Sequence, residues 1–274
     1  MYEPFPKAAS HYSYDQGWFE RLLAIEDRHF WFRARNKVIA TVVSQITANL
    51  APGYRVLEVG CGTGNVLRVL EQTCTNGVVM GMDLFTEGLQ YARRRTTCQM
   101  VQADIHAPPF TTQFHLISLF DVLEHLQDDM QVLRNVHTML AQGGILLLTV
   151  PAHPSLWSYF DEASHHCRRY RVSKLESKLN NTGYQIEYLT QYMVSIFPLV
   201  WLGRRLKSLI DRRSSGSVDR TNALAQAELH ITPVANGLLA FLLAQEARLI
   251  ARRRRLPIGT SILAIARRDR ATDR

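Results

Sequence analysis

The chain has 274 residues, of which 46% are hydrophobic and 20% are charged, and its four cysteines form no C-x-x-C pair. This length suits one sizeable α/β domain or two small domains, and the hydrophobic content excludes disorder throughout. The cysteine spacing argues against a zinc site and a disulfide framework, so we expect a reducing compartment and no metal.

The formal net charge of +8 is concentrated near the C-terminus. Residues 1–199 hold 17 basic and 18 acidic side chains, whereas residues 200–274 hold 15 and 6. This excess fits a solvated helix face with a basic tail, an anionic membrane surface, a phosphate-bearing substrate or nucleic acid. The N-terminus lacks an apolar signal region, and no apolar run reaches the ~20 residues that span a bilayer. We therefore expect a cytoplasmic protein, with peripheral contact at the inner membrane face as an extension.

The predicted elements begin with helical periodicity over residues 12–50, which ends at the Ala-Pro-Gly of residues 51–53. Short apolar runs, predicted as strands, then alternate with helical segments, which indicates a buried parallel sheet of βαβ units. The strands are expected at 55–60, 77–83, 98–104, 114–122 and 143–152, and the helices at 65–74, 85–95 and 129–141. The rest comprises a loop-rich segment at 152–172, a helix at 173–183, a strand at 184–192, helices over 193–257 with a polar interruption at 211–222, and a strand at 260–268.

The order of these elements predicts one domain whose last two strands are separated by a helical insertion. A separate C-terminal helical domain would leave the last strand unpaired. The predicted parts are an N-terminal helical cap (1–50), a cofactor-binding core (51–192), a helical insertion (193–258) and the last strand with a basic tail (259–274).

The segment VLEVGCGTGNVL, Val56 to Leu67, runs from a strand through a glycine turn into a helix. A dinucleotide fold favours G-x-G-x-x-G and a P-loop requires G-K-[ST], whereas here the spacing is G-x-G-x-G followed by Asn65. Glu58, just before the glycines, would repel a pyrophosphate but would suit a ligand with a cationic amino group and a sulfonium. The loop therefore favours S-adenosylmethionine over a dinucleotide.

Two further carboxylates follow predicted strands. Asp83 can accept hydrogen bonds from ribose hydroxyls or can cap the helix that follows it. Asp104 can accept from the exocyclic amine of an adenine, with Ile105 packed on the ring. Both positions lie at the carboxyl ends of parallel strands, where open α/β sheets bind their ligands.

The motifs EVGCGTG, GMD, the Ala-Asp pair at 103–104 and FDVLEHLQD…LRNVHTMLAQGGILLLTVP together resemble the class I S-adenosylmethionine-dependent methyltransferases over about residues 36–190. The resemblance implies a Rossmann-like seven-stranded mixed sheet with helices on both faces and an antiparallel last strand. It also implies that the glycine loop contacts the methionine part of the cofactor and that the residues after the fourth strand border cofactor and acceptor. The cofactor-binding residues expected on this basis are Glu58, Gly60, Cys61, Gly62, Gly64, Asn65, Asp83, Leu84, Asp104, Ile105, Phe120, Asp121 and His125.

The motif HHCRRY (165–170) resembles an H-x-R-R-Y element found in a subset of these enzymes that act in small-molecule or cell-envelope biosynthesis. Its arginines could bind a carboxylate or phosphate of the substrate, or could form structural ion pairs with Asp161 and Glu162. An oxygen or ammonium acceptor also needs a base, although His125 could instead cap a helix. We expect catalytic roles for His125, His166 and Tyr170, and substrate contacts from Tyr14, His165, Arg168, Arg169 and Tyr170.

The run HFWFRARN (29–36) recurs in the same subset. It could fold over the cofactor as a lid, with Trp31 excluding water, Arg33 meeting the methionine carboxylate and Tyr14 in the same lid. Plain packing of its aromatic side chains along a helix is the alternative.

The sequence thus predicts an S-adenosylmethionine-dependent methyltransferase acting on a small-molecule or lipid- or glycan-type acceptor. One alternative is an enzyme that displaces part of the cofactor internally and releases methylthioadenosine. Another is an RNA- or membrane-binding protein on a methyltransferase scaffold. DNA is not expected as a partner, because the N-P-P-[YFW] signature is absent after the fourth strand. The basic helical insertion could shape an apolar pocket, form a dimer face or lie on a membrane.

Overall fold

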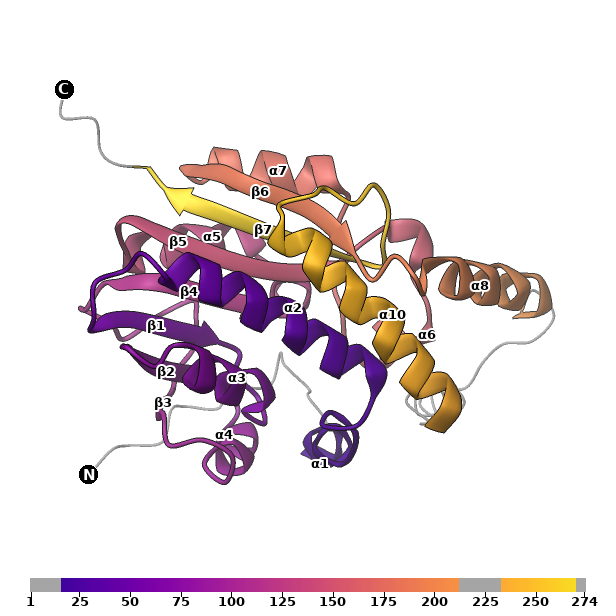
Figure 1. Ribbon diagram of the computed structural model, residues 1–274, viewed down its shortest axis with the longest axis horizontal. Helices are drawn as coiled ribbons and strands as arrows, with labels where there is room; N and C mark the ends of the chain where they lie inside the picture. The colour runs from indigo at the N-terminus through magenta and orange to yellow at the C-terminus, as the bar shows by residue number, and fades with distance from the viewer. Residues whose placement is uncertain (1–15, 212–232, 270–274) are drawn as a thin grey trace.

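The structure is a computed structural model that describes residues 16–211 and 233–269 of the chain. Its centre is a seven-stranded sheet in the order β3-β2-β1-β4-β5-β7-β6 (Figure 1). The strands are β1 (Tyr54–Val59), β2 (Gly77–Asp83), β3 (Gln99–Gln102), β4 (Phe114–Phe120), β5 (Leu140–Pro151), β6 (Tyr184–Tyr192) and β7 (Ser261–Arg268). The first five strands pair in parallel, and β7 runs antiparallel between β5 and β6. The predicted seven-stranded mixed sheet is confirmed.

Helices cover both faces of this sheet. They are α1 (Gln16–Ile25), α2 (Phe30–Thr47), α3 (Asn65–Thr73), α4 (Thr86–Ala92), α5 (Asp129–Met139), α6 (Tyr159–Ala163), α7 (Val172–Asn181), α8 (Phe197–Asp211) and α10 (Pro233–Ala251), with short 3-10 turns η2 (Leu123–His125) and η3 (Pro154–Leu156). Several begin at side chains that satisfy their first backbone N–H groups. Asp128 accepts from the N–H of Gln131 at 2.9 Å to start α5. Ser158 and Asp161 form a capping box at α6.

The core consists of two apolar layers, one on each face of the sheet. Helices α2, α3 and α10 cover one face, and α5 and α7 cover the other. Successive strand residues point to opposite faces, so Val56 joins the first layer and Leu57 the second, and both are fully buried. Because burial of a side chain of this size contributes about 1.5–3 kcal/mol, the layers hold the strand ends in fixed positions.

Helix α10 of the insertion joins the core layer that includes α2. In Figure 1, α10 lies alongside α2, and the two helices are in contact. Asn236 on α10 accepts from the backbone N–H of Phe30 at 2.6 Å and donates to the carbonyl of Arg28 at 3.0 Å, next to the start of α2. At the other end, Gln45 donates to the carbonyl of Ala251 at 2.8 Å. The domain boundaries drawn from the sequence remain predictions.

The element boundaries differ from expectation mainly where strands and helices meet loops. The strand predicted at 98–104 is shorter, at Gln99–Gln102, and β5 starts earlier than predicted, at Leu140. Most of the polar interruption at 211–222 and the end of the basic tail lie outside the described residues. Within the described ranges, no helix combines the length and apolar character that crossing a membrane requires.

Candidate active site

The glycine turn between β1 and α3 requires backbone conformations that side chains disfavour. Gly60 has φ +73° and Gly64 has φ +79°, in the left-handed region. A Cβ at Gly60 would lie 2.5 Å from Cγ2 of Val122, and one at Gly64 would lie 2.8 Å from Cα of Ala92. The glycines therefore permit both the turn and its close contact with the segment after β4 and with α4. Gly62, between them, and the buried Cys61 complete the turn.

Asp83, at the end of β2, stabilises this turn. Its Oδ2 accepts from the N–H of Gly62 at 2.7 Å, and its Oδ1 accepts from the N–H of Phe85 at 2.9 Å. Burial raises the pKa of Asp83, while the N–H groups of Phe85 and Gly62 act in the opposite direction. Each carboxylate oxygen can accept a second hydrogen bond, so a ribose diol can be bound by a side chain that is already oriented.

Arg35 on α2 lies among polar groups from three strands. Its guanidinium donates to Oδ2 of Asp121 at 2.9 Å and lies 4.8 Å from the centre of the Trp31 ring. Glu58 on β1 is buried, and its Oε2 has no hydrogen-bond partner among the described residues; the same holds for the hydroxyl of Tyr192 on β6. Burial raises the pKa of Glu58 well above its usual range, and the charge of Arg35 opposes the shift. Leaving such groups buried and incompletely paired is costly, so a bound polar ligand would stabilise them.

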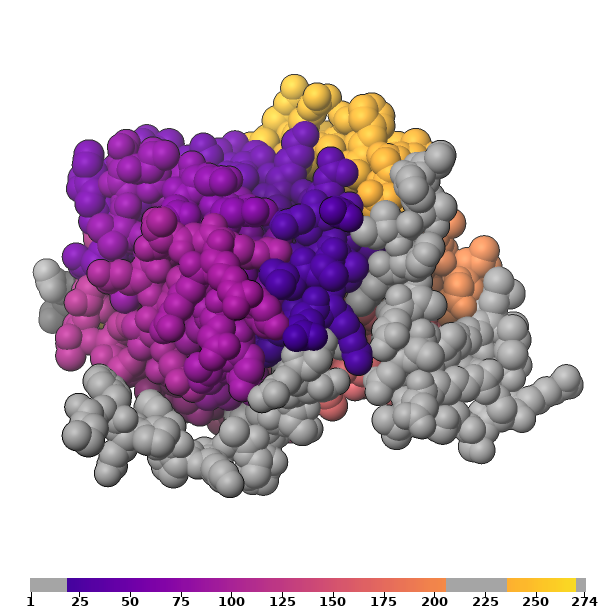
Figure 2. Space-filling model, turned by 90° about the horizontal axis from the view of Figure 1, so that it is seen from below, coloured from indigo at the N-terminus to yellow at the C-terminus, as the bar shows by residue number. Residues whose placement is uncertain are grey.

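The N-terminal helices are attached to the glycine turn by side chains. The hydroxyl of Thr63 donates to Glu26, and the amide of Asn36 donates to Oδ1 of Asn65 at 2.8 Å. Glu26 is also paired with Arg95 at 2.6 Å. Figure 2 shows the indigo N-terminal segment between the magenta part of the core and the yellow α10. These contacts hold the N-terminal helices against the glycine turn, and the cap drawn from the sequence remains a prediction.

The residues expected around an adenine follow β2 and β3. Asp104 is half-buried, and its Oδ1 accepts from the N–H of His106 at 2.8 Å, which fixes the loop. Ile105 is buried, and its carbonyl accepts from the side chain of Asn135 at 2.9 Å. Leu84 is half-buried next to Asp83. Both carboxylates therefore stand at the same edge of the sheet, as parallel strands require.

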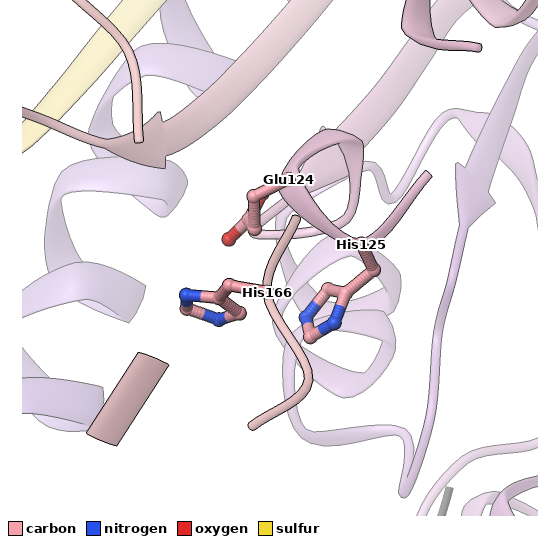
Figure 3. Close-up of side chains that lie close together, drawn as sticks. All are labelled: Glu124, His125 and His166. Atoms are coloured by element: carbon pink, nitrogen blue, oxygen red, sulfur yellow. The ribbon is translucent and has the colours of Figure 1, made fainter. Parts of the chain in front are cut away.

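The segment after β4 gathers the candidate catalytic residues. Phe120 is buried at the end of the strand, and Asp121 has φ +55°, an unusual conformation for a residue with a side chain. The 3-10 turn that follows carries Glu124 and His125, and the ring of His125 lies 4.7 Å from that of His166, edge to face (Figure 3). Burial, followed by the neighbouring His166, lowers the pKa of His125 to about 3.

The HHCRRY motif forms a hydrogen-bonded support for this cluster. Asp161, fully buried, accepts from Nε of Arg169 at 2.6 Å and is bonded to Nδ1 of His166 at 2.9 Å. Burial acts to raise the pKa of Asp161, but His166 and Arg169 outweigh it and lower this pKa to about 2. Arg169 of this motif therefore forms a structural ion pair with Asp161, which is one of the two roles that the sequence analysis considered for the arginines.

A second buried carboxylate, Asp129, organises the rest of the motif. It pairs with Arg168 at 2.8 Å and with Lys178 at 2.6 Å, and it accepts from the hydroxyl of Tyr170 at 2.8 Å. That hydroxyl also lies 3.2 Å from the carbonyl oxygen of Leu123, and burial raises the pKa of Tyr170. Tyr170 and both arginines are therefore bound within the protein, and their expected catalytic and substrate roles stay predictions.

The other residues expected at the site differ in how far they are buried. Arg33 is exposed on α2, Trp31 is half-buried, and His165 is exposed with φ +54°. Tyr14 lies outside the described residues. Sequence reasoning missed Arg35, although helical spacing places it on the same inward face as Phe32 and Ile39, both buried; this spacing could have found it. The residues at the carboxyl edge fit an S-adenosylmethionine, since the glycine turn, a diol acceptor and a buried arginine occur together.

Comparison with known proteins gives the family. A family model described as a methyltransferase domain matches residues 30–189, more than half of the chain. The chain therefore belongs to this family, the class I S-adenosylmethionine-dependent methyltransferases. One similar protein is a ubiquinone biosynthesis O-methyltransferase of Haemophilus ducreyi, 27% identical over 117 residues, or 38% of this chain and 48% of that protein. Another is a trans-aconitate 2-methyltransferase of Rhodopseudomonas palustris, 29% identical over 149 residues, or 53% of this chain and 52% of that protein.

The chain thus spans about half the length of these curated relatives. Among solved structures, the plantazolicin methyltransferase BpumL in complex with SAH superimposes with a TM-score of 0.59. It is 14% identical, and the match covers 96% of this chain and 93% of that protein. This likeness shows that the two chains share their fold.

Proposed function

We propose that the protein transfers the methyl group of S-adenosylmethionine to a small-molecule or lipid-linked acceptor. The observation that carries the proposal is the pairing of Asp83 with the N–H of Gly62 at 2.7 Å, because it orients a ribose acceptor and the glycine turn together. Family membership agrees, and relatives named for ubiquinone biosynthesis and trans-aconitate make a small molecule the first class of acceptor to test.

In this proposal the chain mainly binds and aligns its two substrates. Asp83 holds the ribose, Asp104 and Ile105 meet the adenine, and Arg35 meets the methionine carboxylate. The bound cofactor supplies a methyl group on a sulfonium, which is already an activated leaving group. The protein therefore has to place the acceptor atom in line with it and exclude water. We assign the acceptor side to the segment after β4, with His125 and His166.

Arg35 and Arg33 provide a test of the cofactor assignment on one helix. Replacing Arg35 by methionine is expected to weaken binding of S-adenosylhomocysteine about 10- to 150-fold, because a charge-assisted hydrogen bond contributes roughly 1.5–3 kcal/mol. Arg33→Met, on the exposed side, should change the affinity less than about twofold. Isothermal titration calorimetry measures both. If only Arg33→Met weakened the binding of S-adenosylhomocysteine, the methionine carboxylate would be assigned to Arg33, as the sequence analysis expected, and not to Arg35.

The reaction is tested by analysing products. The purified chain is incubated with S-adenosylmethionine labelled in its methyl group, with and without small hydroxylated and carboxylated acceptors, and the products are separated by liquid chromatography. Labelled acceptor and S-adenosylhomocysteine support the proposal. Methylthioadenosine formed with the cofactor alone supports internal displacement instead. Failure of S-adenosylhomocysteine to raise the melting temperature would favour a scaffold that no longer binds the cofactor.

A lipid-linked acceptor draws support from exposed apolar side chains on α8 and α10. Trp201 and Leu202 on α8 are 45% and 50% exposed, and Phe241 on α10 is 63% exposed. Arg205 lies over the Trp201 ring at 5.4 Å, and Arg248 is exposed on α10. Apolar side chains interspersed with arginines suit an anionic lipid surface. In Figure 1, α8 lies at the right-hand end of the molecule, and α10 runs toward that side from its contact with α2.

Binding to vesicles tests this contact. The chain should co-sediment with vesicles that contain anionic lipid, and the double replacement Trp201→Ser and Leu202→Ser should reduce the bound fraction several-fold. Val78→Ser, at an exposed apolar residue on β2, serves as the matched control and should bind like the original chain. Equal binding by all three proteins would remove the membrane surface from the proposal.

A further inference from the structure

Three potential metal ligands lie together beside the proposed acceptor site. They are Glu124 and His125 on η2 and His166 from the loop after α6 (Figure 3). One ligand atom from each side chain lies within 4.8 Å of the others. No cysteine takes part, so the cysteine spacing that argued against a metal had no bearing on this group.

Glu124 is the unusual member of this cluster. The residue is 1% exposed, and neither of its carboxylate oxygens has a hydrogen-bond partner among the described residues. Burying a carboxylate without partners is costly, and the nearby Asp121 and Asp161 add like charge. Arg169 is the cation that acts on Glu124, but its Nε is already bonded to Asp161. A bound cation would supply the missing partner.

His166 is oriented as metal-ligating histidines usually are. Its Nδ1 is bonded to Asp161 at 2.9 Å, and Asp161 is itself held by Arg169 and by the N–H of Ser158 at 2.9 Å. A carboxylate on one ring nitrogen fixes the tautomer and leaves the other nitrogen, Nε2, as the ligand atom. His125 is half-buried, and one of its ring nitrogens lies within 4.8 Å of the ligand atoms of Glu124 and His166.

The donor set indicates the class of ion. Two imidazoles and one carboxylate suit Zn²⁺, Fe²⁺, Mn²⁺ or Co²⁺ and leave further coordination positions open, whereas Mg²⁺ and Ca²⁺ prefer sites built from oxygen alone. Ligand atoms at about 2.1 Å from a shared ion are at most about 4.2 Å apart. Ligands of a tetrahedral or octahedral ion lie only about 3–3.5 Å apart, so occupation requires these side chains to approach one another by up to about 1–2 Å.

We propose that Glu124, His125 and His166 bind one divalent transition-metal ion. The proposal concerns ion binding alone; where the proposed methyl transfer also holds, the ion would lower the pKa of an acceptor hydroxyl placed at an open position. In that case His125 and His166 act as ligands rather than in the catalytic role as a base that the sequence analysis expected.

The test is direct metal binding to the full chain. The protein is stripped with a chelator, and Zn²⁺ alone is titrated by calorimetry, with Co²⁺ added separately to record its visible ligand-field spectrum. We expect one ion per chain, a rise in melting temperature with Zn²⁺, and a Co²⁺ spectrum typical of nitrogen and oxygen ligands. Glu124→Gln and His166→Gln should each weaken Zn²⁺ binding at least about 10-fold, the scale of effect seen at metal sites.

A matched control and a second readout keep the test decisive. His137→Gln should leave Zn²⁺ binding unchanged, because His137 lies at the end of α5 and its Nε2 is bonded to the carbonyl of Gly183 at 3.1 Å. Glu124→Gln should also be at least as stable as the stripped original chain, since it removes an unpaired buried carboxyl group. If His166→Gln fails to fold, Glu124→Gln alone carries the test.

Absence of stoichiometric Zn²⁺ or Co²⁺ binding would overturn the proposal. Equal binding by the original chain and Glu124→Gln would also overturn it, since the ion would then lie elsewhere. Neither result depends on methyl transfer, because no acceptor or cofactor is present. Conversely, a chain that binds the metal but transfers no methyl group would leave this site intact and remove only the proposed function.

Discussion

Replacing Asp161 by alanine is expected to lower the free energy of unfolding by about 3–5 kcal/mol. The carboxylate is fully buried and holds Arg169 and His166, so its removal leaves a buried guanidinium without a charged partner. It also removes the side chain that completes the cap of α6. Urea denaturation followed by circular dichroism measures the change.

Glu162→Gln is the matched control for Asp161. Glu162 is the neighbouring carboxylate, is exposed, and was an equal candidate for the ion pair from the sequence. Its replacement should alter stability by no more than about 0.5 kcal/mol. If the two variants lose the same stability, the buried ion pair does not hold the HHCRRY segment.

Asp161 also makes the stability of the folded chain depend on pH. Its pKa is lowered from 3.8 to about 2 in the folded chain, because His166 and Arg169 outweigh the effect of burial. The unfolded chain therefore binds a proton first as the pH falls. The contribution of Asp161 is complete above pH about 4 and is lost as the pH falls toward 2. The Asp161→Ala variant should accordingly show a flatter loss of stability over that interval than the Glu162→Gln control.

Replacing Asp83 by alanine is expected to weaken S-adenosylhomocysteine binding by a factor of roughly 10 to 150. Hydrogen bonds to a charged group contribute about 1.5–3 kcal/mol, and this carboxylate is proposed to accept from the ribose. The variant also leaves the N–H groups of Gly62 and Phe85 without their acceptor, so the glycine turn loses its fixed position. Isothermal titration calorimetry gives the affinity.

Two further variants separate the cofactor effect from the effect on the turn. Asp83→Asn keeps one acceptor oxygen and should fall between the original chain and Asp83→Ala in both affinity and melting temperature. Glu176→Ala, an exposed carboxylate on α7, should leave the affinity unchanged. Unaltered affinity in Asp83→Ala would remove the ribose assignment, whatever its effect on stability.

The sequence was most informative where a pattern depends on local periodicity. The alternation of apolar runs and helices predicted the strands, and the residues at their carboxyl ends, such as Asp83 and Asp104, could be placed at one edge because parallel strands end together. The same logic did not place α10, whose apolar residues suggested a pocket, a dimer face or a membrane contact but gave no sign of its neighbour α2. Its packing against α2 depends on long-range contacts such as Asn236 with the start of α2.

The polar site was harder to predict, because side-chain partners are chosen in three dimensions. Asp129 is far from Arg168 in the sequence, so nothing local indicated that it would pair with this arginine and with the hydroxyl of Tyr170. Arg35 was obscured by Arg33, two residues away, although one helical residue points outward and the other inward. Glu124 and His166 approach each other only after β4 and the loop following α6 have been placed.

The position of β7 has a consequence for how the chain acquires its fold. This strand pairs with β5 along one side and β6 along the other, yet it follows both of them in the sequence. Until the residues of β7 leave the ribosome, β5 has one unpaired edge, because it also pairs with β4, and β6 has no paired edge at all. Exposed strand edges of this kind invite pairing with other chains. The interval before β7 inserts is therefore one in which the nascent chain exposes strand edges that the folded protein covers.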